Sequence, residues 1–325
     1  MWRLVLLLLC LVVAPASARE ARAPEAVAAA LERAVKGWAA AQGMSGVVMA
    51  LRHEGQPLRA TGFGRDAGEA VELASLGKAI TAVCAVTLIR DGHWRAETTS
   101  RQVLGYGPED LTLKQLMTHT GGLRPDATQI LMRFWLGKEE AMAQVVSRLA
   151  LKRPRLPGAQ GRYFYNNENY AVIGAMIEVE LARPYAEACA ERVLAPAGVH
   201  GAALSPLTGG TGPWGGWTMS VAEYAAFHDF WYGAEGLMRR EIREIPWASV
   251  WGPVQYGAGM YQREALRAVS FWHSGSWCLP GGRAFGSFAL HWRGAWGVVV
   301  AHDGCADAEA VEALHGALVK ALGPP

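Results

Sequence analysis

The stretch LASLGKAITAVCAVTLI, residues 73–89, carries one charged side chain, that of Lys78. A helix that is apolar almost all round is normally buried, so this stretch predicts a core helix with a lysine in its first turn. Loss of water and the positive end of the helix dipole both disfavour an ammonium ion there. We therefore expect the pKa of Lys78 to lie below its ordinary value, which a lysine base requires.

Ser75 precedes Lys78 by three residues, so the two side chains share one face of the predicted helix. The amine can then accept the proton of the Ser75 hydroxyl, which makes Ser75 a candidate nucleophile. The alternative is a serine that only caps the helix and a lysine that extends toward solvent. For an isolated S-x-x-K spacing this alternative is the more common one, but the apolar surroundings of Lys78 favour catalysis.

A second candidate element is Tyr165-Asn166-Asn167, which precedes an apolar helix predicted to begin near Tyr170. A tyrosine held near a lysine cation can ionise in part and pass a proton to a leaving group. Asn167 offers both a donor and an acceptor to a substrate amide. Taken alone, an aromatic cluster with asparagine caps explains the same residues.

A third candidate element is His273-Ser274-Gly275, at the end of a β-like run. A glycine in a strand lets a substrate backbone approach the sheet edge closely. His273 offers a donor or a charge toward a pocket. In isolation, a strand-end histidine on a solvated face is the more frequent meaning of such a tripeptide.

Together and in this order, the three elements resemble those of the serine β-lactamase and penicillin-binding superfamily. The nearest resemblance is to its class C β-lactamase and DD-carboxypeptidase branch. Two longer phrases are similar to signatures of that branch, LTLKQLMTHTGGL at 111–123 and PGAQGRYFYNNENYAVIG at 157–174. The resemblance covers about residues 30–320, and the combination is far more specific than any single motif.

This resemblance implies an enzyme that forms a covalent ester on Ser75 and releases the acyl group to water. Lys78 and Tyr165 are implied to be the base and the proton shuttle. The backbone N–H groups of Ser75 and Ser276 are implied to form the oxyanion hole, where loss of one donor costs about 2.7–4 kcal/mol. No metal ion and no organic cofactor are implied.

The resemblance also implies the substrate class, a small-molecule or peptide acyl donor. Substrate contacts are implied for Asn167, His273, Gly275 and Ser276. His273 stands where true class C β-lactamases have a lysine, so a DD-carboxypeptidase-like peptidase or amidase, or an esterase, ranks above a β-lactamase. A non-catalytic relative that binds a cell-wall peptide or acts as a structural partner is the alternative from another class, but no motif residue is lost.

The distribution of β-like runs predicts the fold. Two such runs lie near the N-terminus and three near the C-terminus, and the middle of the chain has mainly helical character. We expect a β-lactamase-like α+β fold, with one antiparallel sheet of about five strands built from both ends and flanked by terminal helices. The expected α/β lobe comprises about residues 24–74 and 261–325, and the expected helical lobe about residues 79–260.

Residues 1–18 have the features of a cleaved signal peptide: Arg3, an apolar run from Leu4 to Val13, and small residues up to Ala18. The run is too short to cross a bilayer, which takes about 20 residues. We therefore expect export to a periplasm or to the medium, without a stable membrane anchor. The full chain is globular by composition, at 51% hydrophobic residues, and its formal net charge of +2, or +1 without Arg3, includes no basic stripe for nucleic acid.

Four cysteines lie beyond the predicted signal peptide, at 84, 189, 278 and 305, and three pairings are open to them. Cys278 and Cys305 follow two late strands that should run the same way, so we predict a disulfide between them at the rim of the site. Two free thiols are the alternative. Cys84 lies in the predicted core helix and is expected to be free. No C-x-x-C or H-E-x-x-H spacing predicts a metal site.

Overall fold

The computed structural model describes residues 22–123, 125–240, 246–265, 268–279 and 281–323. The predicted signal peptide, residues 1–18, lies outside the described residues. No helix in the described ranges is long and apolar enough to cross a membrane.

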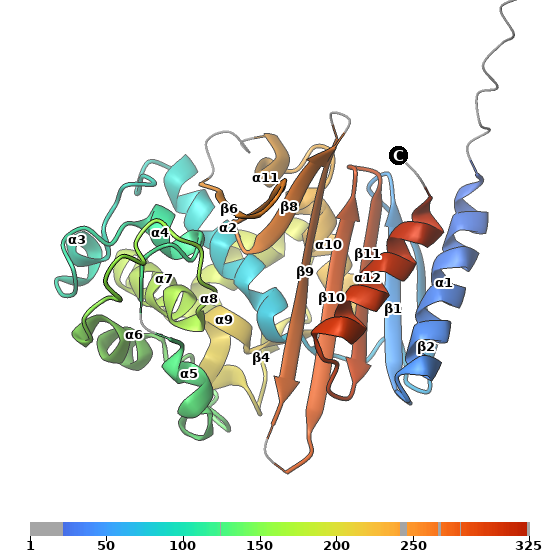
Figure 1. Ribbon diagram of the computed structural model, residues 1–325, viewed down its shortest axis with the longest axis horizontal. Helices are drawn as coiled ribbons and strands as arrows, with labels where there is room; N and C mark the ends of the chain where they lie inside the picture. Colours follow the sequence, from blue (N-terminus) through green and yellow to red (C-terminus); the bar gives the residue numbers. More distant parts are fainter. Residues whose placement is uncertain (1–21, 124, 241–245, 266–267, 280, 324–325) are drawn as a thin grey trace, which may run out of the picture.

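An antiparallel sheet of eight strands forms the centre of the molecule (Figure 1), in the order β2-β1-β11-β10-β9-β8-β7-β6. The strands are β1 (Val47–His53), β2 (Gln56–Phe63), β6 (Ala248–Trp251), β7 (Val254–Gly257), β8 (Met260–Ala265), β9 (Ala268–Cys278), β10 (Ala284–Trp292) and β11 (Trp296–Asp303). Because β1 pairs with β11, segments from the two ends of the chain meet within this sheet. The predicted α+β fold is confirmed.

The number of strands in this sheet corrects the expectation of about five. Residues 248–265 form β6, β7 and β8 at one edge of the sheet. The C-terminal segment that contributes strands to the sheet therefore begins at residue 248 and not near 261. These strands have only four to six residues. The turns between them contain Gly252, Ala258 and Gly259, all with positive φ. Such short runs interrupted by turn residues resemble loops in the sequence, and they become strands only because β8 pairs with β9, β7 with β8 and β6 with β7.

Helices cover both faces of the sheet. Helices α1 (Pro24–Ala41) and α12 (Ala308–Leu322) pack together on one face, and α10 (Val221–Tyr232) contacts β1, β10 and β11 on the other (Figure 1). The alternation of side chains along a strand explains the two cores. Met49 belongs to the core beneath the terminal helices, whereas its neighbour Val48 belongs to the larger core shared with the helical lobe.

The helical lobe is built around α2 (Gly77–Arg90), in which every residue from Gly77 to Leu88 is buried, as the sequence predicts. Its other helices are α3 (Ser100–Leu104), α4 (Leu113–Met117), α5 (Ala127–Ile130), α6 (Ala143–Lys152), α7 (Asn167–Leu181), α8 (Tyr185–Cys189), α9 (Gly212–Gly215) and α11 (Leu237–Arg240). A second, small sheet joins β3 (Val71–Glu72), β5 (Trp217–Met219) and β4 (Ala203–Leu204). Helix α2 contacts α7 and α9 and so lies between the sheet and the rest of the lobe.

Candidate active site

Ser75 lies in a turn of 3₁₀ helix, residues 74–76, immediately before α2. Its Oγ is 3.0 Å from Nζ of Lys78. The serine side chain makes no capping hydrogen bond to the helix, and the lysine is fully buried. Ala74, directly before the nucleophile candidate, has φ +48°, a left-handed conformation that costs roughly 1–2 kcal/mol for a residue other than glycine. The surrounding packing therefore holds Ala74, the residue before Ser75, in a conformation that the local chain disfavours.

The amine of Lys78 is suited to accept a proton near neutral pH. Burial lowers the pKa of Lys78 from 10.5 to about 7, and the nearby carboxylate of Asp126 partly opposes this by favouring the ammonium form. The Nζ also bonds to the carbonyl oxygen of Trp214, 2.7 Å away. With a pKa near 7, about half of the Lys78 side chains are unprotonated at neutral pH.

Tyr165 lies beside both Ser75 and Lys78. Its side chain hydrogen-bonds to that of Ser75, and Nζ of Lys78 lies 5.0 Å from the centre of its ring. Burial raises the pKa of Tyr165 well above 10, although the hydrogen bond to Ser75 partly opposes the shift. The phenol is therefore protonated at neutral pH and can donate a proton. The partial ionisation that we expected from the sequence is not supported, because the loss of water outweighs the nearby lysine.

Asn167 is the first residue of α7, and it contacts Asp126, a residue that the sequence did not single out. Its backbone N–H donates to Oδ2 of Asp126 (3.1 Å), and its Nδ2 donates to Oγ1 of Thr128 (3.1 Å). Its Oδ1 is buried without a partner in the part of the chain that the structure describes. Asp126 lies three residues after the HTGGL phrase. This position is the only feature of the sequence that could have identified it as a site residue.

His273 is buried in β9, with only 3% of its surface exposed. Its Nδ1 donates to the carbonyl oxygen of Ser274 (2.5 Å), and its Nε2 accepts from the hydroxyl of Tyr256 (3.3 Å). Burial, reinforced by the charge of Lys78, lowers the pKa of His273 to about 3. The ring is neutral at ordinary pH and both nitrogens have protein partners. Of the two expectations for His273, a donor or a charge toward the pocket, the charge is not supported, because a buried imidazolium would lack water.

Gly275 brings β9 directly against the nucleophile turn. A Cβ atom at this position would lie 2.5 Å from the carbonyl oxygen of Leu73 and 2.8 Å from the backbone nitrogen of Ser75. Strand β8 pairs with β9 only as far as Trp272, so beyond it β9 has an unpaired edge on that side. Ser276, the next residue, is exposed. Glycine is needed here because any side chain would push the strand away from Ser75.

His119, within the HTGGL phrase, packs against Tyr165 and bonds to residues that follow it. Its Nδ1 faces the backbone N–H of Asn166 (3.3 Å) and Nδ2 of Asn169 (3.0 Å). Its ring centre lies 4.5 Å from that of Tyr165. Because both neighbours are donors, Nδ1 is the acceptor and the proton is on Nε2. His119 thus orients Tyr165 and does not contact Ser75 in the described structure.

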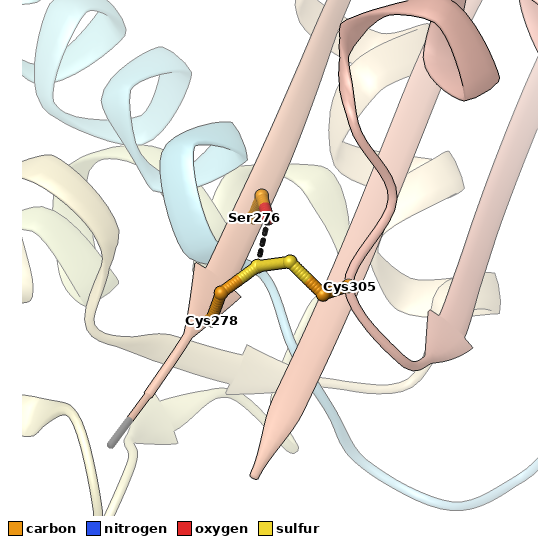
Figure 2. Close-up of a disulfide and its surroundings, with 3 residues drawn as sticks. All are labelled: Ser276, Cys278 and Cys305. Atoms are coloured by element: carbon orange, nitrogen blue, oxygen red, sulfur yellow. Dashed lines mark hydrogen bonds between the residues drawn. A yellow bond between two sulfur atoms is a disulfide. The ribbon is translucent and has the colours of Figure 1, made fainter. Parts of the chain in front are cut away.

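The predicted disulfide between Cys278 and Cys305 is confirmed, with the two Cα atoms 5.5 Å apart. It ties the end of β9 to the segment that follows β11, two residues beyond Ser276 (Figure 2). Cys84 and Cys189 are free and buried. The bond therefore fixes the strand end that bears the third element.

Two further features concern ligands. Among the described residues, no group of three or more His, Cys, Asp or Glu side chains is arranged to hold a metal ion. A cavity of about 990 Å³ lies among Arg90, Asp229 and Arg239, and none of the candidate catalytic residues lines it. The candidate site is instead the place where α2, the segment before α7 and the free edge of β9 meet.

A serine beside a buried lysine, as in this fold, is an arrangement suited to the nucleophilic step of a serine hydrolase. The family model described as Beta-lactamase matches residues 28–304, so the chain belongs to the β-lactamase family. The predicted family is thereby confirmed. No sequence among the curated proteins matches the chain.

Solved structures share the fold at low sequence identity. The D-amino acid amidase from Ochrobactrum anthropi SV3 is 17% identical, with a TM-score of 0.71 over 89% of this chain and 98% of the amidase. A D-stereospecific amidohydrolase from Streptomyces sp. is 18% identical, with a TM-score of 0.71 over 87% and 97%. The octameric penicillin-binding protein homologue from Pyrococcus abyssi is 17% identical, with a TM-score of 0.71 over 89% and 76%. At these identities the likeness concerns the fold.

Proposed function

We propose that this protein is an exported serine acyl hydrolase that works through an acyl-enzyme on Ser75. The observation that carries the proposal is the 3.0 Å contact between Oγ of Ser75 and the amine of Lys78. Burial brings the pKa of that amine to about 7. A serine hydroxyl is a weak nucleophile until an adjacent base takes its proton, and Lys78 is placed and tuned for that step.

The proposed reaction has two halves. Ser75 Oγ attacks the substrate carbonyl while its proton passes to Nζ of Lys78, and the backbone N–H groups of Ser75 and Ser276 stabilise the oxyanion. When the bond to the leaving group breaks, the phenol of Tyr165 protonates that group, and Lys78 returns a proton to the phenolate. Water then attacks the ester, its proton enters the same relay, and Ser75 leaves as the hydroxyl.

The charges at the site favour an amidase, esterase or peptidase acting on a neutral leaving group. A β-lactam or the C-terminus of a peptide carries a carboxylate, and the neutral, buried His273 provides no cation for it. Two of the structural neighbours are named as an amidase and an amidohydrolase, which supports the same ranking. A dedicated β-lactamase or DD-carboxypeptidase is the second candidate.

Export is part of the proposal and rests on the predicted signal peptide at residues 1–18. The disulfide between Cys278 and Cys305 supports it, because such bonds persist in oxidising compartments and are rare in the cytosol. Cleavage can be tested by N-terminal sequencing of the protein recovered from the periplasm or the medium. A mature chain that still begins at Met1 would contradict the export proposal.

Labelling with a fluorophosphonate tests the nucleophile. The wild-type protein should take up one label, and Ser75→Ala should take up none while retaining the same unfolding temperature. Absence of label from the wild type would favour the non-catalytic relative, and persistence in Ser75→Ala would exclude Ser75 as the nucleophile. A panel of nitrophenyl esters, amino-acid anilides, a chromogenic cephalosporin and a D-alanyl-D-alanine peptide would then rank the acyl donors.

A further inference from the structure

Asp126 places a carboxylate without a cationic partner beside the reacting groups. Its charge acts on both Lys78 and Tyr165, and its Oδ2 accepts from the backbone N–H of Asn167, two residues after Tyr165. Lys78 does not bond to it, because Nζ is directed at Ser75 and the carbonyl oxygen of Trp214. Within the described ranges Asp126 forms no ion pair. Asp126 also caps α5, where its side chain accepts from the backbone N–H of Thr128, but an uncharged asparagine or serine serves equally well as a cap, so this role does not require its charge.

The carboxylate is held in place by three hydrogen bonds. Oδ1 accepts from the backbone N–H of Thr128 (2.8 Å) and from its hydroxyl (2.6 Å), and Oδ2 accepts from the backbone N–H of Asn167 (3.1 Å). Two carboxylate oxygens offer about four acceptor positions, so one position is still open. The side chain is therefore preorganised to accept a further donor without rearrangement.

In the described structure, the same hydrogen-bond network leaves a second acceptor, Oδ1 of Asn167, without a donor. Since the Thr128 hydroxyl donates to Asp126, it must accept from the amide NH₂ of Asn167, which fixes the orientation of that amide. The Oδ1 atom of Asn167 is then the other end of the amide, and it is buried without a partner in the described structure. A buried acceptor without a donor costs about 1–3 kcal/mol unless a ligand supplies one.

The other ionisable groups near Ser75 carry little positive charge. His273 is neutral, and the pKa of Lys78 near 7 leaves its amine only about half protonated at neutral pH. Asp126 is the carboxylate among these residues, and its Coulomb interaction favours a positive charge beside it, as it does on Lys78. A negative charge with two free acceptors matches a protonated amine, which has one positive charge and three N–H donors.

We propose that Asp126, with Oδ1 of Asn167, binds the α-ammonium group of an amino-acyl substrate whose carbonyl is attacked by Ser75. The substrate class is then amino-acid amides, amino-acid esters or peptides with a free N-terminus. The α-amine is two bonds from the scissile carbonyl carbon, so a substrate placed at Ser75 brings it to the same small region. This inference rests on the proposed acyl hydrolase function and names its acyl group.

Matched pairs of substrates test the ammonium site. Alanine p-nitroanilide, in D and L forms, is compared with its N-acetyl derivative at pH 6.5, where a free α-amine of pKa about 7.7–8.0 is protonated. The ratio of kcat/KM for the free and acetylated substrates cancels changes in the catalytic machinery. We expect a ratio of at least tenfold in the wild type for one of the two stereoisomers. We also expect this ratio to fall toward one in Asp126→Asn.

Two companion variants make the result specific. Asp126→Glu keeps the charge and should retain most of the preference, whereas a loss equal to that of Asp126→Asn would mean that the charge is not what is recognised. Asp110→Asn removes an exposed carboxylate that is paired with Arg155, and it should keep the full wild-type ratio. Should Asp126→Asn fail to fold, the wild-type ratio must still decline as pH rises through the pKa of the substrate amine.

The outcomes separate this inference from the proposed function. Hydrolysis that depends on Ser75 but shows no preference for the free amine would overturn the ammonium site and leave the acyl hydrolase intact. Failure of the wild type to react with fluorophosphonate or with any ester or anilide would overturn the proposed function itself. A preference for the acetylated substrate would also refute the role of Asp126.

Discussion

The two walls of the active site are made of different kinds of structure. The helical wall, formed by Lys78, Tyr165 and Asp126, presents ionisable side chains, and burial and neighbouring charge set the protonation of Lys78 and Tyr165. The sheet wall, formed by the end of β9 with Gly275 and Ser276, presents backbone that is held by close packing and a disulfide. The comparison indicates that the pH dependence of activity belongs to the helical wall and the geometry of the oxyanion hole to the sheet wall.

The largest effect is expected from removing the base on the helical wall. Lys78→Met keeps the length and apolar stem of the side chain but cannot accept a proton. Because a positioned base contributes about 10²–10⁴-fold, the rate of fluorophosphonate labelling should fall by that factor. Lys114→Met, at an exposed position, is the matched control and should label at the wild-type rate. A Lys78→Met variant with more than a tenth of the wild-type rate would show that another group is the base.

The next largest effect is expected from Gly275→Ala on the sheet wall. The added Cβ would meet the backbone at 2.5–2.8 Å, so the strand must move away from Ser75. A misplacement of about 1 Å can cost about 10²-fold in rate, which we expect in both labelling and ester hydrolysis. The control is Gly316→Ala in α12, where nothing lies within 4 Å of the new methyl group. Unchanged rates in Gly275→Ala would mean that close packing of β9 is not required.

The pH dependence of the acylation rate should reflect the ionisable groups of the helical wall. Only the neutral amine of Lys78 accepts a proton, so the acylation rate should be low in acid and rise with pH, with a midpoint near the pKa of about 7. Because Asp126 stabilises the ammonium form, Asp126→Asn should lower the midpoint. His273→Gln on the sheet wall should leave the midpoint unchanged, since that histidine has a pKa of about 3. A midpoint that moved with His273 instead of Asp126 would reverse the assignment.

The smallest effect on rate is expected from opening the disulfide. Cys305→Ser removes a bond that closes a loop with a sequence separation of 27 residues, so the free energy of unfolding should fall by about 3–4 kcal/mol. Thermal unfolding with and without reductant measures this loss, and the variant should no longer respond to reductant. Since Gly275 and the pairing of β9 with β10 still hold the strand, the loss in acylation rate should be much smaller than for Gly275→Ala. An equal loss would show that the bond, and not the packing, positions the sheet wall.

The fold was predictable from the sequence where the patterns are long. Strands β9, β10 and β11 are β-like runs of 8 to 11 residues, and α1 and α12 are amphipathic helices of 18 and 15 residues. Strands β6 to β8 were not predictable, because runs of four to six residues broken by glycine acquire their conformation from pairing along the edge of a sheet. Local propensity is too weak to specify them.

The candidate site was predictable in part for a similar reason. Ser75 and Lys78 are three residues apart on one helix, so their proximity follows from helix geometry. Asp126 and His119 reach the site from loops, and no local pattern places them there. The charge state of His273 was left open by the sequence, because it depends on burial by Tyr256 and other neighbours that only the folded chain brings together.

The sequence by itself determined that a lysine enters a buried helix one turn from a serine, because the continuous hydrophobicity of a segment and the period of the α-helix are properties of neighbouring residues. It also identified the cysteines that form the disulfide, since the directions of successive strands follow from chain order. Only the tertiary structure decided which groups are charged and which backbone atoms come together around Ser75. Desolvation and Coulomb interactions depend on distances between residues far apart in the chain, and those distances exist only after folding.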